Sequence, residues 1–305
     1  MVIVRDLVTS DEEGWLRVRR AALPFLPLVA GQVRHDLEHS LPQEHRRFLV
    51  AEEDGEMIAT AEVGIAHDSP EPGQGYCNVH THPERTGRGA GSLLAAAAEE
   101  HLAGVGASAV YAWVLDGPGS LEFARRRGYT PSRTAHFLRR DLVDGPPLPR
   151  RPPPDGVEVR SAADFAADPR PLFEADAETT ADEPSDVPAS LDDYAQWLDT
   201  TWRHPAFDHH LTSVVTVDGT VAAFSVGFTD GLSRYGSGMT GTRRAFRGRG
   251  LAKLAKTASL RRARALGCTE AFTGNDAGNG PMLAVNEALG YEICATEVRH
   301  VRTLG

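Results

Sequence analysis

The chain has 305 residues, which is long for one domain and enough for two that each bury a hydrophobic core. Its composition, 41% hydrophobic and 24% charged, is typical of a soluble globular protein. The formal net charge of −10 argues against nucleic acid as a general partner and suits a cationic small molecule.

Several short sequence features indicate where the protein is located and whether it binds a metal. The N-terminus has no basic region followed by an apolar one, so no secretory signal is expected. The most apolar stretches are too short to cross a bilayer. Cys77, Cys268 and Cys294 form no CxxC pair, which argues against a disulfide framework or a structural zinc site. We therefore expect a cytoplasmic protein with no membrane association and no bound metal.

One segment of the first half matches a metal motif. Residues 35–39, HDLEH, fit the H-x-x-E-H pattern of inverted zinc metallopeptidases, with His35 and His39 as ligands. Three fixed positions carry little information, and matches without structural context are mostly accidental. A metallopeptidase is therefore a distant third alternative for the function.

Residues 144–156, DGPPLPRRPPPDG, mark the clearest boundary in the chain. Proline is excluded from the interior of helices and sheets, so this segment is predicted to be an extended spacer. It separates a first domain, residues 1–143, from a second, residues 157–305.

The two halves repeat one another. Four short matches recur at offsets of 155 to 164 residues, which indicates a tandem duplication of one domain. The matched pairs are Arg5 with Arg160, Gly55 with Gly219, Gly89 with Gly250, and Gly128 with Gly290.

The second half predicts an α+β order of elements. Residues 157–160 predict a strand, residues 189–202 a helix, and residues 211–228 a hairpin about Asp218-Gly219. These are followed by a strand at 234–242, a helix from Leu251 that Gly267 ends, a strand at 268–275, a helix at 279–290 and a strand at 291–303. In the helix from Leu251, the spacing predicts an apolar face of Leu254, Ala255, Ala258, Ala265 and Leu266, with Lys253, Lys256, Arg261 and Arg264 between them.

The start of that helix, FRGRGLAKL, predicts an anion site. Helix N-termini carry unpaired N–H groups and partial positive charge, and glycine lets a large anion approach. The segment lacks the residues of a Walker loop and the third glycine of the dinucleotide fingerprint. An arginine-rich surface turn is the alternative on this stretch alone.

Taken together, these segments resemble the GNAT family of N-acetyltransferases. The family pattern of Arg or Gln, two residues, Gly, one residue, and Gly or Ala is met by Arg247, Gly250 and Ala252. The segment TGNDAGNGPMLAVNEALGY resembles the second family segment and closes with Gly290-Tyr291. The repeat resembles two-domain members of the family. The resemblance implies two tandem GNAT-type domains of the α+β class, each a mixed, mostly antiparallel twisted sheet flanked by helices.

The resemblance also implies the reaction. An amine of a small molecule would attack acetyl-CoA directly in a ternary complex, and a backbone N–H of a splayed strand at 239–242 would polarise the thioester carbonyl. The acetyl-CoA-binding residues implied are Thr240, Gly241, Thr242, Arg247, Gly248, Arg249, Gly250, Leu251, Ala252, Lys253, Asn275, Asn279, Met282 and Asn286.

The sequence indicates the general acid and the general base of this reaction less clearly. The family often uses a tyrosine as acid, but that position holds Asn286 in the second half and Ala124 in the first. The catalytic candidates are therefore Thr242, Asn286 and Tyr235, although the pattern favours Tyr235 as a structural strand aromatic. The missing tyrosines leave an inactive acyl-CoA-binding sensor or scaffold as the alternative function.

Acidic residues could serve the acceptor. Residues 174–186 lie where the family usually walls the acceptor site, and could either capture a cationic amine or form a solvated loop. Asp230 and Glu270 are isolated carboxylates with nothing to distinguish them. The identity of the acceptor and the oligomeric state stay open.

The first half is predicted to be a degenerate copy. Thr86 stands where the second half has Arg247, and Asp116 would place negative charge near a polyanionic cofactor. A weak second cofactor site is still possible at Arg88, Gly89, Gly91 and Ser92.

Overall fold

The computed structural model describes residues 1–149, 152–185, 187 and 189–304. Both halves have the same succession of strands and helices. The first half contains β1 (Val2–Asp6), α1 (Glu12–Ala22), α2 (Gln32–His39), β2 (Arg47–Glu53), β3 (Glu56–Ile65), β4 (Gln74–Thr81), α3 (Ala90–Gly104), β5 (Ala109–Leu115), α4 (Pro118–Arg126) and β6 (Thr130–Asp141).

The second half repeats this order after the proline-rich segment. It contains β7 (Val157–Ser161), α5 (Arg170–Thr180), α6 (Tyr194–Trp197), a π-helical turn (Leu198–Trp202), β8 (Ser213–Val217), β9 (Thr220–Thr229), β10 (Arg234–Thr242), α7 (Leu251–Ala265), β11 (Glu270–Asp276), α8 (Gly280–Glu287) and β12 (Glu292–Thr303). The α+β class and the tandem arrangement are confirmed. Among the described helices, none is long and apolar enough to span a membrane.

Hairpin turns of one kind join corresponding strands in the two halves. Asp54 and Gly55 between β2 and β3, and Asp218 and Gly219 between β8 and β9, all have positive φ, from 48° to 80°. Two successive residues of positive φ make the turn that suits the twist of a two-residue hairpin, and Asp-Gly tolerates it well.

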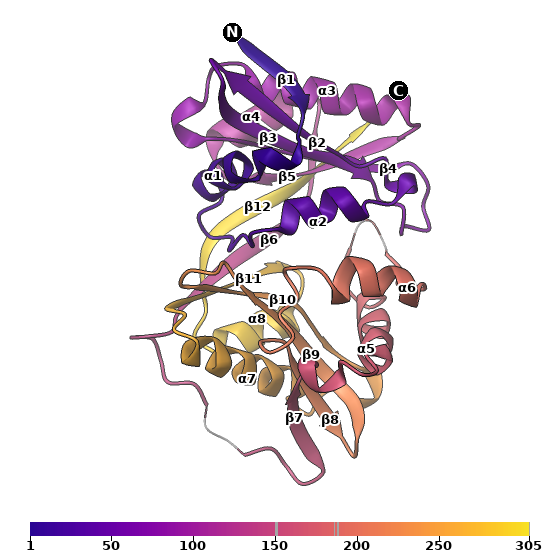
Figure 1. Cartoon of the computed structure of the whole chain (residues 1–305), viewed down its shortest axis with the longest axis vertical. Helices are drawn as coiled ribbons and strands as arrows, with labels where there is room; N and C mark the ends of the chain where they lie inside the picture. The colour runs from indigo at the N-terminus through magenta and orange to yellow at the C-terminus, as the bar shows by residue number, and fades with distance from the viewer. Residues whose placement is uncertain (150–151, 186, 188, 305) are drawn as a thin grey trace.

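The halves share one sheet of twelve strands because their last strands are exchanged. The strand order is β1-β2-β3-β4-β5-β12-β6-β11-β10-β9-β8-β7. Strand β12 crosses to the first half and pairs with β5, while β6 pairs with β11 of the second half (Figure 1). The two exchanged strands also pair with each other. The division into 1–143 and 157–305 therefore describes the repeat in the sequence, whereas the sheet runs across it.

Helices cover both faces of the second half of the sheet (Figure 1). Successive strand residues point to opposite faces, so Val214 packs in the cluster that contains Leu172 of α5, and Val215 packs with Ala255 of α7. The end of β10, where it approaches the start of α7, thus lies between two helical layers.

Some boundaries and faces differ from the sequence expectations. The predicted helix at 189–202 begins only at Tyr194, because the Asp193 side chain caps it by accepting from the N–H groups of Ala195 and Gln196. In α7, Leu266 is 67% exposed just beyond the helix, whereas Lys256, expected on the polar face, is 1% exposed. Most of the acidic residues 174–186 lie on α5 and the turn that follows it.

Candidate active site

The gap between β10 and β11 is the central feature of the second half. The two strands pair in parallel from Arg234 opposite Glu270 to Ser237 opposite Thr273, and the described pairing ends there. On its other side, β10 has a bulge against β9 between Ser237 and Thr240. A bulge re-aims backbone groups, so the main chain around Met239 leaves the ladder where the two strands separate. The splay expected at 239–242 therefore begins at the bulge.

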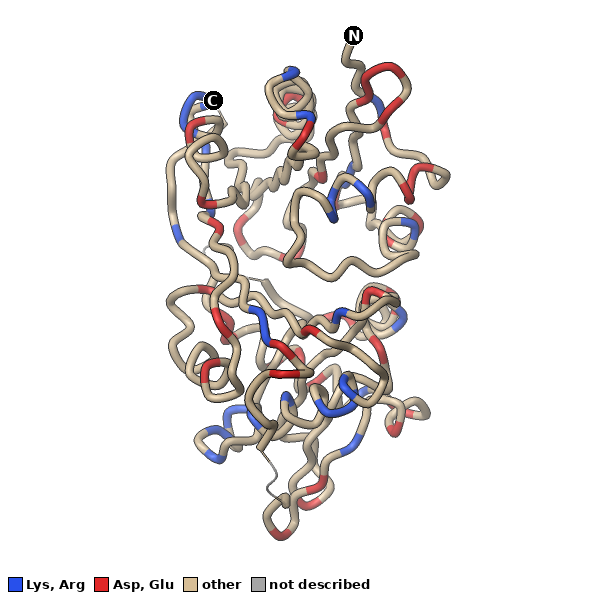
Figure 2. The backbone as a smooth tube through the Cα atoms, turned by 90° about the vertical axis from the view of Figure 1, so that its left-hand side faces the viewer, with Lys and Arg blue, Asp and Glu red and all other residues tan. Residues whose placement is uncertain are grey.

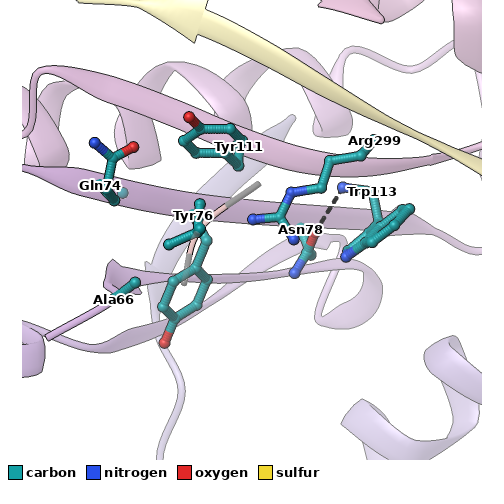
Figure 3. A pocket seen from close by; sticks show the side chains of 9 residues that line it. Ala66, Gln74, Tyr76, Asn78, Tyr111, Trp113 and Arg299 are labelled. Atoms are coloured by element: carbon teal, nitrogen blue, oxygen red, sulfur yellow. Dashed lines mark hydrogen bonds between the residues drawn. The ribbon is translucent and has the colours of Figure 1, made fainter. Parts of the chain in front are cut away.

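The corresponding strands of the first half separate without a bulge. Pairing of β4 with β5 stops after Tyr76 opposite Tyr111, but β4 stays in register with β3 along its whole length. Asn78 closes part of the gap, since its Oδ1 accepts from the N–H of Trp113 at 3.0 Å (Figure 3). Beside it lies a cavity of about 210 Å³, where Arg299 lies over the Tyr111 and Trp113 rings.

The predicted anion turn lies at the start of α7. Gly248 and Gly250 have φ of 75° and 73°, a conformation that favours glycine, and a Cβ at either would meet nothing within 4 Å. Gly250 is the N-cap of α7, so the N–H groups of Leu251, Ala252 and Lys253 begin the helix without intrahelical acceptors. The geometry leaves an open approach to these amides, which suits a phosphate group.

Arginines surround the turn, but acidic residues hold several of them. Arg247 donates to the carbonyl of Thr242 at 3.1 Å and to the Asp182 carboxylate, which also receives two bonds from Arg244. These bonds lower the pKa of Asp182 to about 2. Glu178 pairs with Arg243 at 2.8 Å. Two carboxylates of the segment 174–186 are therefore committed to the turn and not free for an acceptor.

Figure 2 shows acidic and basic residues interspersed along both halves of the chain. The net negative charge is thus spread along the chain. Arg249 is exposed beside the Phe246 ring, 5.9 Å from its centroid.

The three predicted asparagines have different surroundings. Asn279 is the N-cap of α8, and its Oδ1 accepts from the N–H of Met282 at 3.3 Å. Asn286 is fully buried on α8 and donates through Nδ2 to Oδ1 of Asn275 at 2.5 Å. Asn286 Oδ1 is buried with no hydrogen-bond partner among the described residues. A buried acceptor without a partner is costly, so Asn286 is the asparagine whose geometry points to a missing ligand.

The end of β10 brings together the remaining predicted residues. Thr240 Oγ1 lies 3.0 Å from Ser225 Oγ on the α7 side of the sheet. Gly241 lies against α5, where an added Cβ would come within 2.5 Å of Thr179 Oγ1. The Thr242 carbonyl is bonded by Arg247. These residues therefore line the strand that leads to the turn, with their side chains on alternating faces.

Tyr235 lies in the core. Its side chain is fully buried, its hydroxyl lies 2.7 Å from Ser259 Oγ, and burial raises its pKa to about 12. It is on the paired part of β10, before the strands separate. This placement fits the strand-aromatic interpretation better than a proton donor.

The other isolated candidates also have structural partners. Asp230 pairs with Arg234 at 2.9 Å and Glu270 with Arg139 at 2.5 Å. The rings of the HDLEH segment stack on each other at 4.0 Å, and one of them bonds the Asp199 carbonyl. No group of three metal-ligating side chains occurs among the described residues.

A cluster of polar side chains lies beneath the gap between β10 and β11. The sequence did not predict this cluster. Lys256 of α7 is buried, and its Nζ lies 3.3 Å from Thr273 Oγ1. Thr273 in turn donates to the carbonyl of Ser237 at 3.2 Å. Tyr291 faces Lys256, with Nζ 5.4 Å from the ring centroid. The lysine is thus placed at the point where β10 and β11 separate.

The first half keeps the turn but not its surroundings. Gly89, with φ of 86°, caps α3 as Gly250 caps α7, and Arg88 pairs with Glu53. Gly91 lies close to Thr81, and Ser92 is exposed. The start of α3 is therefore as open as that of α7.

Known proteins support this interpretation of the fold. The model of the acetyltransferase (GNAT) family matches twice, at residues 15–129 and 173–291. The chain is 28% identical to the mycothiol acetyltransferase of Nocardiopsis dassonvillei over 324 residues, covering 96% of this chain and 95% of that protein. A second mycothiol acetyltransferase, from Geodermatophilus obscurus, is 32% identical over 165 residues, 52% of each chain.

Solved structures share the tandem fold. A tandem GNAT protein from the clavulanic acid biosynthesis pathway has a TM-score of 0.75 at 22% identity and covers all of this chain and 99% of its own. A GCN5-related N-acetyltransferase from Sphaerobacter thermophilus has a TM-score of 0.69 at 23% identity, covering 99% and 95%. Because the family model matches most of the chain, once in each half, the chain belongs to the acetyltransferase (GNAT) family and is an acetyl-CoA-dependent N-acetyltransferase.

Proposed function

We propose that the second half carries the catalysis and transfers the acetyl group to the amine of a small thiol conjugate of the mycothiol pathway. The observation that carries this assignment is the bulged, splayed end of β10 beside an open glycine turn, which occurs in the second half. The full-length likeness to a mycothiol acetyltransferase supports the choice of acceptor.

In this proposal acetyl-CoA lies between β10 and β11 with its pyrophosphate at the start of α7. The N–H groups from Gly248 to Lys253 bind phosphate oxygens, and Arg247 and Arg249 add charge. A backbone N–H at the bulge polarises the thioester carbonyl, and preorganised donors of this kind are usually the largest electrostatic contribution to acyl transfer. Asn286 Oδ1, buried without a partner, can accept from an N–H of the bound cofactor.

The acceptor would enter from the α5 side of the sheet. Glu178 and Asp182 pair with arginines of the turn, so capture of a cationic amine falls to other carboxylates of the segment, such as the exposed Glu174. A primary amine must lose its proton before it attacks, because its pKa of about 10 keeps it charged at neutral pH.

The test is acetyl transfer from acetyl-CoA to a panel of amines. The panel comprises deacetylated mycothiol, an amino sugar, a polyamine, an aminoglycoside and a peptide with a free N-terminus. Because the first acceptor carries a thiol, free CoA and the acetylated amine are measured by chromatography and mass rather than by a thiol reagent. We expect the highest kcat/KM with deacetylated mycothiol. CoA binding without transfer to any amine would instead support the sensor or scaffold alternative.

A further inference from the structure

The chain contains very few lysines. Of its 32 basic residues, 30 are arginine, and the two lysines both lie on α7, three residues apart. Lysine is usually a solvated surface residue and is rarely fully buried unless paired. Lys256 is 1% exposed, and no acid among the described residues forms an ion pair with it. An unpaired buried lysine destabilises the folded protein when it is charged, so its retention needs a reason.

The position of Lys256 supplies that reason. Its Nζ lies 3.3 Å from Thr273, and Thr273 bonds the carbonyl of Ser237, so the amine is next to the last residue pair before the strands separate. Asn286 approaches the same strand from α8 through Asn275, two residues beyond Thr273. The lysine and the position where the family often has its tyrosine acid therefore converge on one segment of β11.

We propose that Lys256 donates the proton to the coenzyme A sulfur as the thioester bond breaks. The inference rests on the proposed function, which places acetyl-CoA in this gap. Lys256 reaches the gap from the α7 face, opposite the α5 face from which the acceptor enters, so its placement suits the leaving thiol rather than the incoming amine.

Acetyl transfer forms one C–N bond and breaks one C–S bond. The amine nitrogen forms a bond to the carbonyl carbon, the C–S bond breaks, and its electron pair stays on sulfur. An N–H of protonated Lys256 gives its proton to that sulfur, and neutral Lys256 takes a proton back from solvent. The attacking amine releases its proton to solvent, so the products are the acetylated amine and the coenzyme A thiol.

Burial brings the pKa of Lys256 close to neutral pH. Desolvation lowers the pKa of Lys256 from its ordinary 10.5 to about 7, near the pH at which proton donation is most efficient. The titratable groups around it are Tyr291 after α8 and Tyr235 of β10, which bonds Ser259 one turn along α7. Burial raises the pKa of both phenols above the ordinary value, and Arg140 of β6 faces Tyr291. Near neutral pH, Lys256 is therefore the titrating group of this cluster.

The first experiment compares Lys256→Met, Lys256→Arg and the wild type in acetyl transfer and in CoA binding by calorimetry. We expect Lys256→Met to keep its affinity for CoA within threefold and to lose kcat roughly 100-fold, the lower range for a general acid. In the wild type, kcat should fall as pH rises above the pKa of Lys256, and in Lys256→Arg this fall should disappear together with most of kcat. Leu260→Met, a buried change on the same helix, should leave kcat unchanged.

The second experiment measures the proton directly. Protein labelled with [ε-¹³C]lysine has two lysine signals, and Lys253→Arg identifies which belongs to Lys256. We expect the Lys256 signal to titrate between about pH 6 and 8, and Lys253 near its ordinary pKa.

Three results would overturn the proposal: a kcat for Lys256→Met within threefold of the wild type, a loss of CoA affinity as large as the loss of kcat, or a Lys256 signal that titrates above pH 10. Each of these can occur in a protein that transfers acetyl groups, so each removes the role of Lys256 alone. A wild type that neither binds CoA nor transfers acetyl groups overturns the proposed function, and this inference with it.

Discussion

The two halves have the same fold, yet the space beneath the splayed strands is polar in one and apolar in the other. Seven polar residues of the second half correspond to apolar residues or cysteine in the first. The pairs are Ser225 with Ala61, Ser237 with Cys77, Thr240 with Val79, Lys256 with Ala95, Thr273 with Ala112, Asn275 with Val114, and Asn286 with Ala124. In the first half these positions belong to the hydrophobic core or lie against it.

Strands β10 and β4 differ in length by one residue. Strand β10 has nine residues and β4 has eight, and the extra residue of β10 is accommodated at its bulge. Where β10 bulges, β4 continues its ladder and places Asn78 across the gap. One inserted residue and a set of polar substitutions thus separate the proposed site from the packed core of the first half, as expected where function resides in the site and not in the fold.

Removing the bulge should have the largest effect. Deleting Met239 would give β10 the length of β4 and return its backbone N–H groups to the ladder. Loss of an oxyanion donor costs roughly 10²–10³ in kcat, and we expect a loss at the upper end. Acetyl transfer by the folded deletion variant checks this, with Asn78→Ala in the first half as the control that keeps full activity. A deletion variant with more than a tenth of wild-type kcat would contradict the role of the bulge.

Replacing the buried lysine should raise stability while it lowers activity. Because the pKa of Lys256 is about 7 in the folded protein and about 10.4 in an unfolded chain, the unfolded state binds more protons between these values. The free-energy cost of burying charged Lys256 is therefore largest below pH 7 and decreases as the pH rises to 10. We expect Lys256→Met to gain roughly 4 kcal/mol at pH 7 and less than about 1 kcal/mol at pH 10.

Urea unfolding of both proteins at the two pH values checks the lysine prediction. The informative quantity is the difference between variant and wild type, since other groups titrate equally in both. Ala95→Met, at the matching position of the first half, carries no charge change and should show a difference that does not vary with pH. An equal stability gain at pH 7 and pH 10 would show that Lys256 carries no charge penalty.

The two glycine turns give a matched pair of variants. Gly250→Val and Gly89→Val place the same branched side chain at helix N-caps with φ of 73° and 86°, so the backbone strain is comparable. We expect Gly250→Val to weaken CoA binding roughly 30- to 100-fold, because it covers the amides that hold the phosphate. Gly89→Val should leave acetyl transfer nearly intact. Transfer that survives in Gly250→Val but not in Gly89→Val would place catalysis in the first half.

The sequence could predict those features that depend on local physics. Asp-Gly turns, the glycine at the helix start, and the period of the strands each require particular residues, so the order of elements from residue 189 onward and the helix start at Gly250 were predicted correctly, whereas helix α5 was not predicted. The exchange of β6 and β12 could not be predicted this way. The strand pattern of each does not specify its partner, and the tertiary arrangement decides which half it joins.

The buried polar cluster was missed for a different reason. Periodicity assigns charged residues to the solvent face, so Lys256 was placed with Lys253 and the arginines of α7. A compositional signal was available, since lysine occurs at two positions in a chain with 30 arginines. Its burial depends on Thr273 of β11 and on Tyr291, which reach α7 only after the sheet has formed.

The smallest expected effect concerns the acidic residues that hold the turn arginines. Asp182 pairs with Arg247 in the second half, whereas in the first half Glu53 pairs with Arg88, which corresponds to Arg249. Asp182 is exposed to solvent and competes with phosphate for Arg247, so Asp182→Asn should tighten CoA binding by about two- to threefold, the scale of an exposed ion pair. Calorimetry at low and high salt checks this, because screening should shrink the difference between Asp182→Asn and wild type. Glu53→Gln, which frees an arginine at the first-half turn, is the control and should leave the affinity of the second-half site unchanged. A weaker CoA affinity in Asp182→Asn would instead show that the carboxylate positions Arg247 for the pyrophosphate rather than competing with it.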